Sequence, residues 1–470
     1  MAHPLERLLN PKSVAVVGAK KVDNYGWLHT VENFKGNKYH VNIDKSEWPG
    51  AEELGFPNYS SIMDLPEAPD FVIFSVPAPV VPRVLKDCIA KGVYGLHLYT
   101  AGFSESHTEV GIALEKQIVE MAKASGIKII GPNCLGLFNP KAGIGTNIGG
   151  YHGEAGNFAF ISQSGSQSGG FAKGALVNGI KVSKLVSMGN GIILDSPDYL
   201  EYFAQDPETK VIGMYLEGVR DGKRFFKVLR ETCQKKPVLV WKVGETEDAA
   251  RAVESHSTTK STSAVVWDSM LRQCGAIKVN NVDEMYEVGK LLLKLRPVTG
   301  NRVAIFALSG GHATESTNVF SKADFNVTKL TDESYKRILE KFNTTGSQYL
   351  NPFEGGAFRD PWVMNNVMNV VNEDPNVDIM VHEMHVRVAP DGSTSLYRNY
   401  PASFFIDFYK NRCRKPYVIV LSTIHPRAAP EVTDAVYKEL SDAGIPVVFG
   451  LQGAADAMKT AVSYYRYKAD

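Results

Sequence analysis

The stretch SVAVVGA, residues 13–19, is a compact apolar run that ends in Gly18 and Ala19. Four similar runs follow it, at residues 40–44, 69–77, 95–102 and 127–133. Segments of helical period separate the last three runs, and each of these segments ends in glycine, where helices commonly stop. Short apolar strands that alternate with helices are typical of βαβ units and a parallel sheet. The sequence therefore predicts a doubly wound α/β domain over residues 1–148.

The same alternation recurs twice more along the 470 residues. A glycine-rich stretch, residues 141–156, precedes the second set, and Pro297–Asn301 precedes the third. We predict a second domain over residues 149–297 and a third over residues 300–470, which makes the fold class α/β with three doubly wound parallel-sheet domains. Sheets of this kind bind ligands outside the carboxyl ends of their strands. Functional residues are therefore expected where strands end.

The composition excludes several classes of protein. The chain has 51 basic and 51 acidic residues and a net charge of zero, which argues against a nucleic-acid partner. Its five cysteines form no CxxC pair, so we expect neither a disulfide scaffold nor a structural zinc site. We expect a reduced, cytoplasmic setting instead. Apolar runs stay shorter than about 18 residues, so we expect no membrane helix and no membrane partner.

The turn after the first strand has features of an anion site. Gly18 allows a ligand to approach the backbone closely, and Lys20 and Lys21 add positive charge. The turn lacks the further glycines of a GxGxxG fingerprint, which argues against NAD. A nucleotide-like phosphate ligand and a plain tight turn both remain open at this point.

Two later strands break into small residues before a helix begins. In ISQSGSQSGG, residues 161–170, this break lies at Ser162, Gln163, Ser164 and Gly165, and in LSGGHATEST, residues 308–317, it lies at Ser309, Gly310 and Gly311. A helix N-terminus directs unpaired N–H groups and the positive end of the dipole at an anion. The sequence indicates phosphate or carboxylate binding at these helix starts, and two unrelated capped helices remain the alternative.

A third candidate centres on histidine. His256 lies in a polar segment, residues 244–265, that is rich in small residues and predicted to be a loop. It is either a solvated loop residue or a nucleophile, and a nucleophile needs a carboxylate to orient its ring. Glu217, at the end of the strand in YLEGV, is positioned to supply one. HEMH, residues 382–385, is not HExxH and places its histidines on no useful helical face, so we predict no metal site.

These motifs, together with GPNCLG (residues 131–136), TAGFSE (residues 100–105) and ARAVESH (residues 250–256), occur in a distinctive order and spacing. In this order the chain resembles the nucleoside-diphosphate-forming acyl-CoA synthetases, and among them the α subunits of ADP-forming acetyl-CoA synthetases, relatives of the succinyl-CoA synthetase α subunit. The resemblance covers essentially the whole chain. It implies a Rossmann-like CoA-binding domain followed by two flavodoxin-like domains of the succinyl-CoA-synthetase type.

The resemblance also implies roles for the candidate residues. His256 would carry the phosphoryl group, Glu217 would fix its tautomer, and the two helix starts would hold the phosphate between them. Asn133 and Cys134 would line the thioester end of the substrate. CoA, itself a substrate, would contact strand-end residues of the first domain, which are Gly18, Ala19, Lys20, Lys45, Val76, Pro77, Thr100, Ala101 and Gly102.

The reaction implied by the resemblance is carboxylic acid + CoA + ATP ⇌ acyl-CoA + ADP + phosphate. All 470 residues are accounted for by the three α/β domains, so the ATP-grasp module that binds ATP or ADP with Mg is expected on a separate β subunit, in an α2β2 assembly. The alternative is a non-catalytic protein of the same fold that binds CoA or acyl-CoA.

Overall fold

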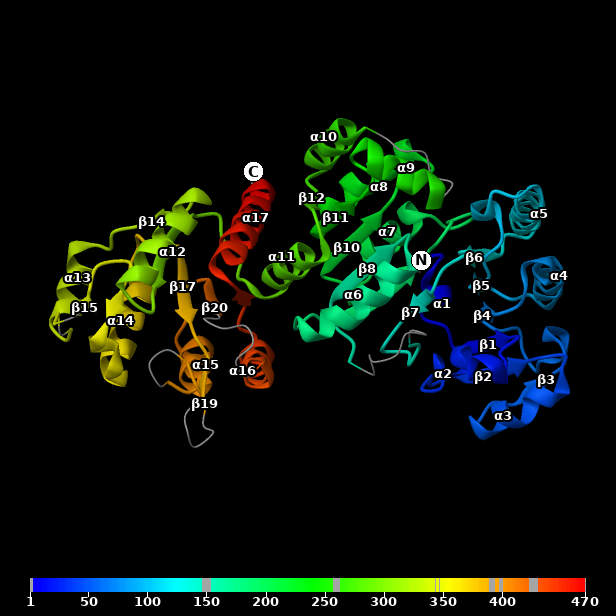
Figure 1. The fold of residues 1–470 in the computed structure, drawn as a ribbon, viewed down its shortest axis with the longest axis horizontal. Helices are drawn as coiled ribbons and strands as arrows, with labels where there is room; N and C mark the ends of the chain where they lie inside the picture. Colours follow the sequence, from blue (N-terminus) through cyan, green and yellow to red (C-terminus); the bar gives the residue numbers. More distant parts are fainter. Residues whose placement is uncertain are drawn as a thin grey trace. The chain divides into compact units, whose positions relative to one another are not determined.

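The computed structural model describes residues 3–145, 154–256, 263–342, 344–345, 347–388, 394–396, 400–421 and 430–469. Within these ranges it does not describe the side chains of residues 255–256, 355–357, 387–388, 394 and 430. The chain divides into two compact units, Met1–Met285 and Tyr286–Asp470. Figure 1 shows parallel strands with helices on both faces of the sheets in each unit.

The first sheet of the first unit has the strand order β3-β2-β1-β4-β5-β6, and its paired strands are parallel. This order is that of a Rossmann fold, with the switch point between β1 and β4. Its strands are β1 (Ser13–Val17), β2 (Asn37–Val41), β3 (Asn58–Tyr59), β4 (Phe71–Phe74), β5 (Gly95–Leu98) and β6 (Lys128–Ile130). Its helices are α1 (Glu6–Leu9), α2 (Gly26–His29), α3 (Trp48–Glu53), α4 (Val81–Lys91) and α5 (Glu109–Ser125).

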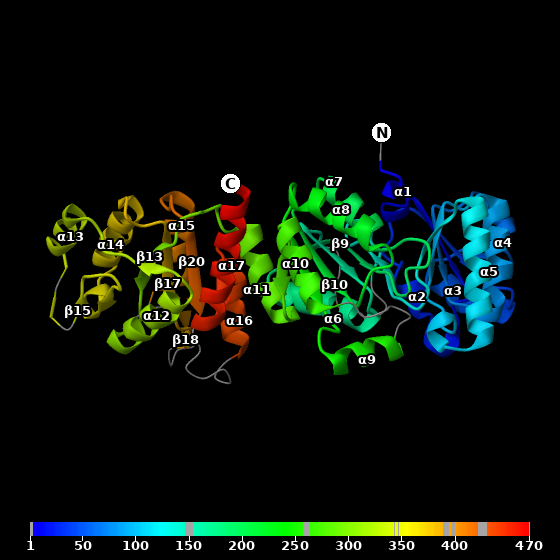
Figure 2. The ribbon, with the colours of Figure 1, turned by 90° about the horizontal axis from the view of Figure 1, so that it is seen from above.

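Alternate side chains of β1 enter different cores. Ala15 and Val17 pack with residues of α4 and α5, which lie side by side over one face of the sheet (Figure 2). Val14 and Val16 belong to a core that also contains residues of α2 and of the second sheet. This shared core is why the first two sheets form one compact unit. Helices α4 and α5 end at the glycines from which their ends were predicted. Gly92 and Gly126 adopt the left-handed conformation that stops each helix.

The second sheet has the order β12-β11-β10-β8-β9-β7. Its strands are β7 (Gly136–Phe138), β8 (Phe158–Ser162), β9 (Val182–Ser187), β10 (Val211–Leu216), β11 (Val238–Lys242) and β12 (Ile277–Val279). Its helices are α6 (Gly165–Val177), α7 (Ser196–Gln205), α8 (Gly222–Cys233), α9 (Glu247–His256) and α10 (Ala264–Cys274), and the following helix α11 (Val282–Lys294) contains the boundary between the two units. The five parallel strands have flavodoxin-like order, with the switch point between β8 and β10.

Strand β7 crosses the domain boundary drawn from the sequence. It lies before residue 148, yet it pairs antiparallel with β9 at the edge of the second sheet. The parallel pattern of the preceding strands carries no signal for this pairing. The chain from Ile130 to Phe138 therefore links the first two sheets directly.

The second unit contains the third sheet, with the flavodoxin-like order β14-β13-β17-β20-β21 and parallel pairing. Its strands are β13 (Arg302–Phe306), β14 (Asn326–Val327), β17 (Ile379–Met384), β20 (Tyr417–Leu421) and β21 (Val447–Phe449). The helices are α12 (Gly310–Lys322), α13 (Asp332–Leu339), α14 (Pro361–Glu373), α15 (Ala402–Asn411), α16 (Pro430–Asp442) and α17 (Leu451–Ala469). Two small antiparallel pairs are β15 (Ser347–Gln348) with β16 (Glu354–Gly355), and β18 (Arg387–Val388) with β19 (Thr394–Ser395). The predicted α/β class with three doubly wound sheets is confirmed.

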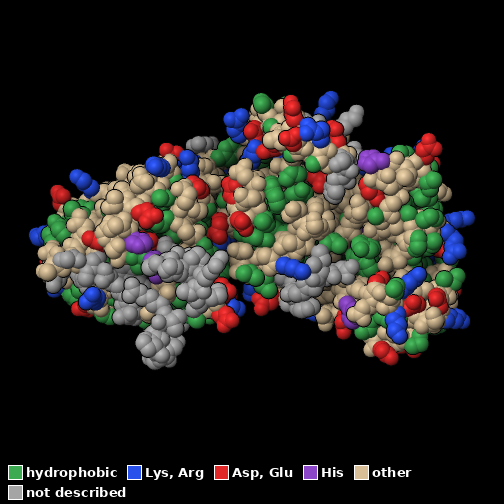
Figure 3. Space-filling view, in the orientation of Figure 1, with side chains coloured by type: hydrophobic (Ala, Val, Ile, Leu, Met, Phe, Trp, Pro, Cys, Tyr) green, Lys and Arg blue, Asp and Glu red, His purple; other side chains and the backbone are tan. Residues whose placement is uncertain are grey.

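Among the described residues, no helix is long and apolar enough to cross a membrane. Basic and acidic side chains are interspersed over the face drawn in Figure 3. This agrees with the balanced composition of the chain.

Candidate active site

Three turns meet at the switch point of the first sheet. Gly18 follows β1 with a φ of 87°, and a Cβ atom at this position would lie 2.6 Å from the carbonyl oxygen of Ser75. Only a glycine lets these two turns approach so closely without strain. The Thr100 hydroxyl donates to the carbonyl oxygen of Val76 at 2.6 Å, which joins the turn after β5 to the turn after β4. The predicted CoA contacts on β1, β4 and β5 are therefore neighbours.

The remaining predicted CoA contacts lie around the same edge. The carbonyl oxygen of Ala19 accepts a hydrogen bond from the Asn42 side chain at 3.0 Å, which ties the β1 turn to the end of β2. Lys20 and Lys45 are both exposed. Pro77, Ala101 and Gly102 are exposed in the turns after β4 and β5, and Gly102 donates its N–H to Glu105 at 2.7 Å. Two exposed lysines beside a glycine turn suit a phosphate-bearing ligand.

Asn133 lies where the first sheet meets the second. Its backbone N–H donates to the carbonyl oxygen of Thr100 at 3.0 Å, and its φ is 57°. Gly189, which follows β9, packs so closely that its Cβ would lie 2.5 Å from the Asn133 carbonyl oxygen. The Cys134 side chain is buried, and burial raises the pKa of its thiol to about 12. Asn133 therefore lies between the turns after β5 and β9, whereas Cys134 packs beneath it as an unreactive thiol, and their predicted contact with the thioester remains a prediction.

Acidification is expected to destabilise the first unit through His97. Its ring is 1% exposed, its Nε2 lies 3.0 Å from the carbonyl oxygen of Cys134, and burial lowers its pKa from 6.5 to about 4. Between these values the unfolded chain binds a proton that the folded chain does not. Stability is therefore complete above pH ~6.5 and falls as the pH drops towards ~4, by on the order of 3 kcal/mol.

The measurement is urea unfolding between pH 4 and pH 7. His97→Gln should flatten the profile, because a glutamine amide can donate to Cys134 but does not titrate. His29→Asn removes a histidine whose side chain is 41% exposed and serves as the control. An unchanged slope in His97→Gln would show that other groups cause the acid sensitivity.

The switch point of the second sheet is organised by serine and glutamine. Ser164 is the N-cap of α6, and its hydroxyl accepts the N–H of Gln167 at 3.3 Å. The Ser162 hydroxyl, fully buried at the end of β8, donates to the Ser164 carbonyl oxygen at 2.9 Å. Gly165 opens the helix, where a Cβ would only touch Leu135 at 3.4 Å. The predicted helix start is confirmed. Phosphate binding at this helix start remains a prediction.

Glu217 is held at the same switch point. It follows β10 and is 5% exposed. The side-chain oxygen of Gln163 accepts the backbone N–H groups of Glu217 and Gly218, at 2.5 and 3.0 Å. Gln163 thereby links the start of α6 to the turn that carries the carboxylate. The predicted residues of β8 and β10 are brought together.

Lys242 is a residue of this site that the sequence analysis missed. It ends β11, pairs in register with Leu216, and is 4% exposed. Burial lowers the pKa of Lys242 below its usual value, and the negative charges of Glu245 and Glu217 only partly oppose this shift. Its Nζ lies 5.3 Å from the centre of the Trp267 ring. The sequence did contain a signal for Lys242. This lysine ends the strand in KPVLVWKVG, and that strand lies beside the one that Glu217 directly follows.

The prediction that His256 lies in a loop is wrong, because His256 is the last residue of helix α9. The helix forms because the Thr246 hydroxyl accepts the N–H of Ala249 at 3.2 Å and because Glu247 and Asp248 favour the first turn. Val253 packs against Gly244 and is buried. The His256 side chain and residues 257–262 lie outside the described residues, so the predicted Glu217–His256 hydrogen bond remains a prediction.

In the second unit, Ser309 is the N-cap of α12, and Gly310 and Gly311 begin the helix. A Cβ on Gly310 would lie 3.2 Å from the Glu354 carboxylate, so an acidic side chain lies beside this helix start. The predicted helix is confirmed. Phosphate binding here remains a prediction.

Comparisons with known proteins identify the family of the chain. Residues 12–140 match the family model of a CoA binding domain, and residues 155–292 match that of a succinyl-CoA ligase like flavodoxin domain. Subunit alpha of ADP-forming acetate–CoA ligase I of Pyrococcus furiosus is 30% identical over 475 residues, which cover 99% of this chain and 98% of the relative. The chain belongs to the ADP-forming acyl-CoA ligase family.

Other members of the ligase family differ in length. ADP-forming acetate–CoA ligase I of Archaeoglobus fulgidus is 36% identical over 383 residues, and the match spans 80% of this chain but only 54% of the relative. The structure of acetyl-coenzyme A synthetase 1 of Candidatus Korarchaeum cryptofilum, in complex with phosphate and ADP, superposes with a TM-score of 0.85 at 28% identity. The superposition covers 99% of this ligase-family chain and 98% of the Korarchaeum chain.

Proposed function

We propose that this chain is the CoA-binding, histidine-phosphorylated α subunit of an ADP-forming acyl-CoA ligase. The observation that carries the proposal is the convergence of Gly18, Val76 and Thr100 at the switch point of a Rossmann-like sheet. That sheet lies within the residues that match the CoA-binding family. The turns form an edge at which a CoA phosphate would find backbone N–H groups and the amines of Lys20 and Lys45.

The proposed reaction is written here in the direction of ATP formation. A phosphate oxygen attacks the thioester carbonyl, the C–S bond breaks, and CoA leaves as a thiol after taking a proton. A ring nitrogen of His256 then attacks the phosphorus of the acyl phosphate, and the carboxylate leaves. The phosphohistidine finally transfers its phosphoryl group to ADP. A neutral imidazole suits this role, because it is nucleophilic near pH 7.

Glu217 is proposed as the residue that positions His256. A carboxylate that accepts the N–H of one ring nitrogen leaves the lone pair of the other nitrogen directed at phosphorus. Gln163 fixes the backbone of Glu217, and the charge of Lys242 acts on the same carboxylate. Because Glu217 is 5% exposed, its charge is little screened by water and acts strongly on the ring.

The helix starts at Ser162–Gly165 and Ser309–Gly311 are proposed to bind the phosphoryl group. Both begin with small residues that allow close approach of an anion to backbone N–H groups. Preorganised N–H groups stabilise the charge that develops during transfer. At α12 the carboxylate of Glu354 opposes an anion, so we assign the stronger binding to α6.

An ATP-grasp β subunit is proposed as the partner that binds ATP or ADP with Mg, in an α2β2 assembly. Two observations support a partner. The relative that this chain matches over 98% of its length is named a subunit alpha. The Archaeoglobus relative extends well beyond the 54% that this chain matches.

The purified chain alone is expected to bind CoA with a stoichiometry of one. Calorimetry should detect the binding, and CoA should raise the thermal midpoint by mass action. The double variant Lys20→Glu, Lys45→Glu should bind at least about tenfold more weakly, because hydrogen bonds to charged groups contribute about 1.5–3 kcal/mol each.

Lys86→Glu is the matched control, because it reverses the charge of an exposed lysine on α4, outside the proposed contacts. Its affinity for CoA should equal that of the unmodified chain. No heat and no midpoint shift with CoA in the millimolar range would refute the assignment of the first domain.

A further inference from the structure

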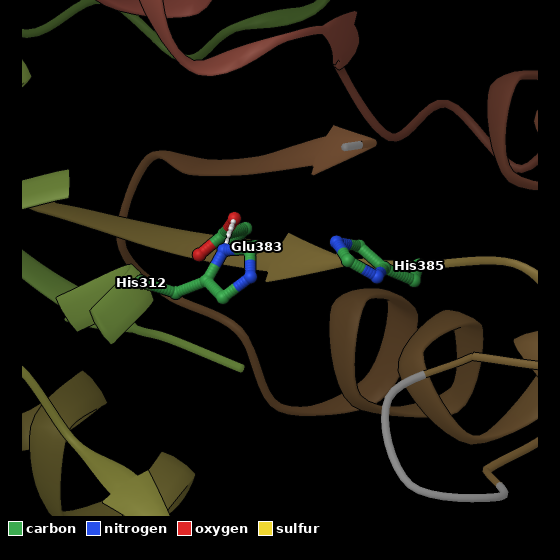
Figure 4. A group of neighbouring side chains, drawn as sticks. All are labelled: His312, Glu383 and His385. Atoms are coloured by element: carbon green, nitrogen blue, oxygen red, sulfur yellow. Dashed lines mark hydrogen bonds and ion pairs between the residues drawn. The ribbon is translucent and has the colours of Figure 1, made fainter. Parts of the chain in front are cut away.

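Three potential ligand side chains converge at the switch point of the third sheet, between β13 and β17. His312 is on the first turn of α12, which follows β13. Glu383 lies within β17, and His385 follows this strand directly. Figure 4 shows the three side chains near the carboxyl end of β17. This is the place where open α/β sheets bind ligands.

The two-residue period of a strand explains why Glu383, within β17, and His385, directly after it, lie on the same side of the sheet. His382 and Met384 point into the apolar core, where the His382 ring stacks on Phe306 with centroids 4.5 Å apart. Glu383 therefore faces the opposite side of the sheet, towards α12, and His385 follows at the same period of two. On a helix Glu383 and His385 would point apart, so the helical interpretation of HEMH predicts no metal site, whereas a strand places both residues on one side.

The distances within the cluster are short. Nδ1 of His312 lies 2.8 Å from Oε1 of Glu383, and the His312 and His385 rings meet edge to face with centroids 5.3 Å apart. One ligand atom from each of the three residues lies within 4.8 Å of those of the other two. The Glu383 side chain is fully buried, His385 is 5% exposed, and the His312 side chain is 32% exposed.

The chemistry of this set fits a divalent transition metal. Imidazole nitrogen suits Zn²⁺, Fe²⁺ and their neighbours, whereas Mg²⁺ prefers oxygen ligands. The buried Glu383 carboxylate lies 2.8 Å from Nδ1 of His312 and accepts the Ser316 hydroxyl at 3.4 Å, and a metal ion would add a positive partner to it. Two histidines and one glutamate are a known ligand set of zinc sites that keep a position open.

The geometry needs only a small adjustment. Ligand atoms on one ion lie at most about 4.2 Å apart, twice a bond of about 2.1 Å. The pair formed by His312 and Glu383 is already within this limit. The widest separation in the cluster, up to 4.8 Å, requires one imidazole to turn inward by about half an ångström or more. His312 is partly exposed and begins a helix, so its side chain has room for this movement.

The cluster borders a cavity of about 1190 Å³. Both histidines line it, together with Ser309, Arg359, Tyr400 and Arg412. An ion held by three protein ligands would therefore keep a coordination position directed at a cavity with two guanidinium groups in its wall. An anionic oxygen, such as that of a carboxylate or phosphate, suits both the ion and the arginines.

We propose that His312, Glu383 and His385 form a binding site for one divalent transition-metal ion of the Zn²⁺ type, with an open coordination position towards this cavity. Ser309, which is proposed above to bind the phosphoryl group, also lines this cavity, but metal binding itself does not depend on phosphoryl transfer at His256. Its test therefore requires no turnover and no partner subunit.

The test is calorimetric titration of Zn²⁺ into the full chain after chelator treatment, with Co²⁺ absorption as the spectroscopic readout. We expect one site whose affinity falls at least tenfold in His312→Asn, since even the loss of a residue that supports a ligand costs about 10–100-fold. His312 is partly exposed, so this variant should fold. Glu383→Gln is a second variant, with the same volume and no charge.

His29→Asn is the matched control, because His29 forms a similar pair with Glu32 at 3.1 Å on the surface of the first unit. It should leave Zn²⁺ affinity and the Co²⁺ spectrum unchanged, and Mg²⁺ should not displace Zn²⁺. Equal Zn²⁺ affinity in the unmodified chain, His312→Asn and Glu383→Gln would overturn the proposal. The cluster would then be a hydrogen-bonded network only.

Discussion

His256→Ala is expected to abolish acyl-CoA formation by the assembled enzyme, because no other group would carry the phosphoryl intermediate. CoA affinity and the thermal midpoint should remain close to those of the unmodified chain. The proposed CoA contacts lie in the turns after β1, β2, β4 and β5, whereas His256 ends helix α9. The measurements are the steady-state rate with the partner subunit, calorimetry with CoA, and thermal unfolding.

His107→Asn is the control for this variant. His107 is exposed and has a φ of 54°, a conformation that asparagine tolerates. Its rate should match that of the unmodified enzyme. Substantial turnover in His256→Ala would eliminate the phosphohistidine route and require another carrier for the phosphoryl group.

Glu217→Gln is expected to slow phosphorylation of His256 by on the order of 10²-fold, because positioned groups of this kind contribute on that scale. Glutamine keeps the size of the side chain and its backbone contacts with Gln163. It removes the negative charge that stabilises the imidazole N–H. The effect should therefore appear in kcat and in single-turnover phosphorylation, while the KM for CoA stays unchanged.

Glu245→Gln is the matched control. The charge of Glu245 acts on the same Lys242, but its carboxylate also pairs with Lys278 at 2.7 Å. Its rate should remain within a few-fold of the unmodified enzyme. If Glu217→Gln and Glu245→Gln slow the reaction equally, or if KM rises without a change in kcat, Glu217 does not position His256.

Much of the fold was predictable because local signals agree with the tertiary structure. Buried parallel strands are continuous apolar runs, as in β1 and β4, and glycine ends α4 and α5. The candidate residues Gly18, Ser164 and Glu217 were predictable for a related reason. Gly18 and Glu217 directly follow apolar strands, and Ser164 caps the helix after one. Such positions lie at the switch point of a parallel sheet.

Other features depend on contacts between distant segments. The edge position of β7 depends on its pairing with β9, and no pattern within residues 136–138 indicates it. Helix α9 borders a stretch of small polar residues, which favour caps and turns, and among its described side chains only Val253 is buried, so the sequence of this segment predicts a loop. The cluster of His312 with Glu383 and His385 unites residues about 70 positions apart, a convergence that only the order of the third sheet produces.

The most direct test of the central claim is to locate the phosphoryl group. The full chain would be incubated with its ATP-grasp partner and γ-labelled ATP in the absence of any acid or CoA, because charging of the histidine precedes the choice of substrate. We expect one acid-labile, base-stable label per chain, located by mass spectrometry on His256, dependent on the partner and absent from His256→Ala. Label on another residue, or undiminished labelling of His256→Ala, would contradict this expectation.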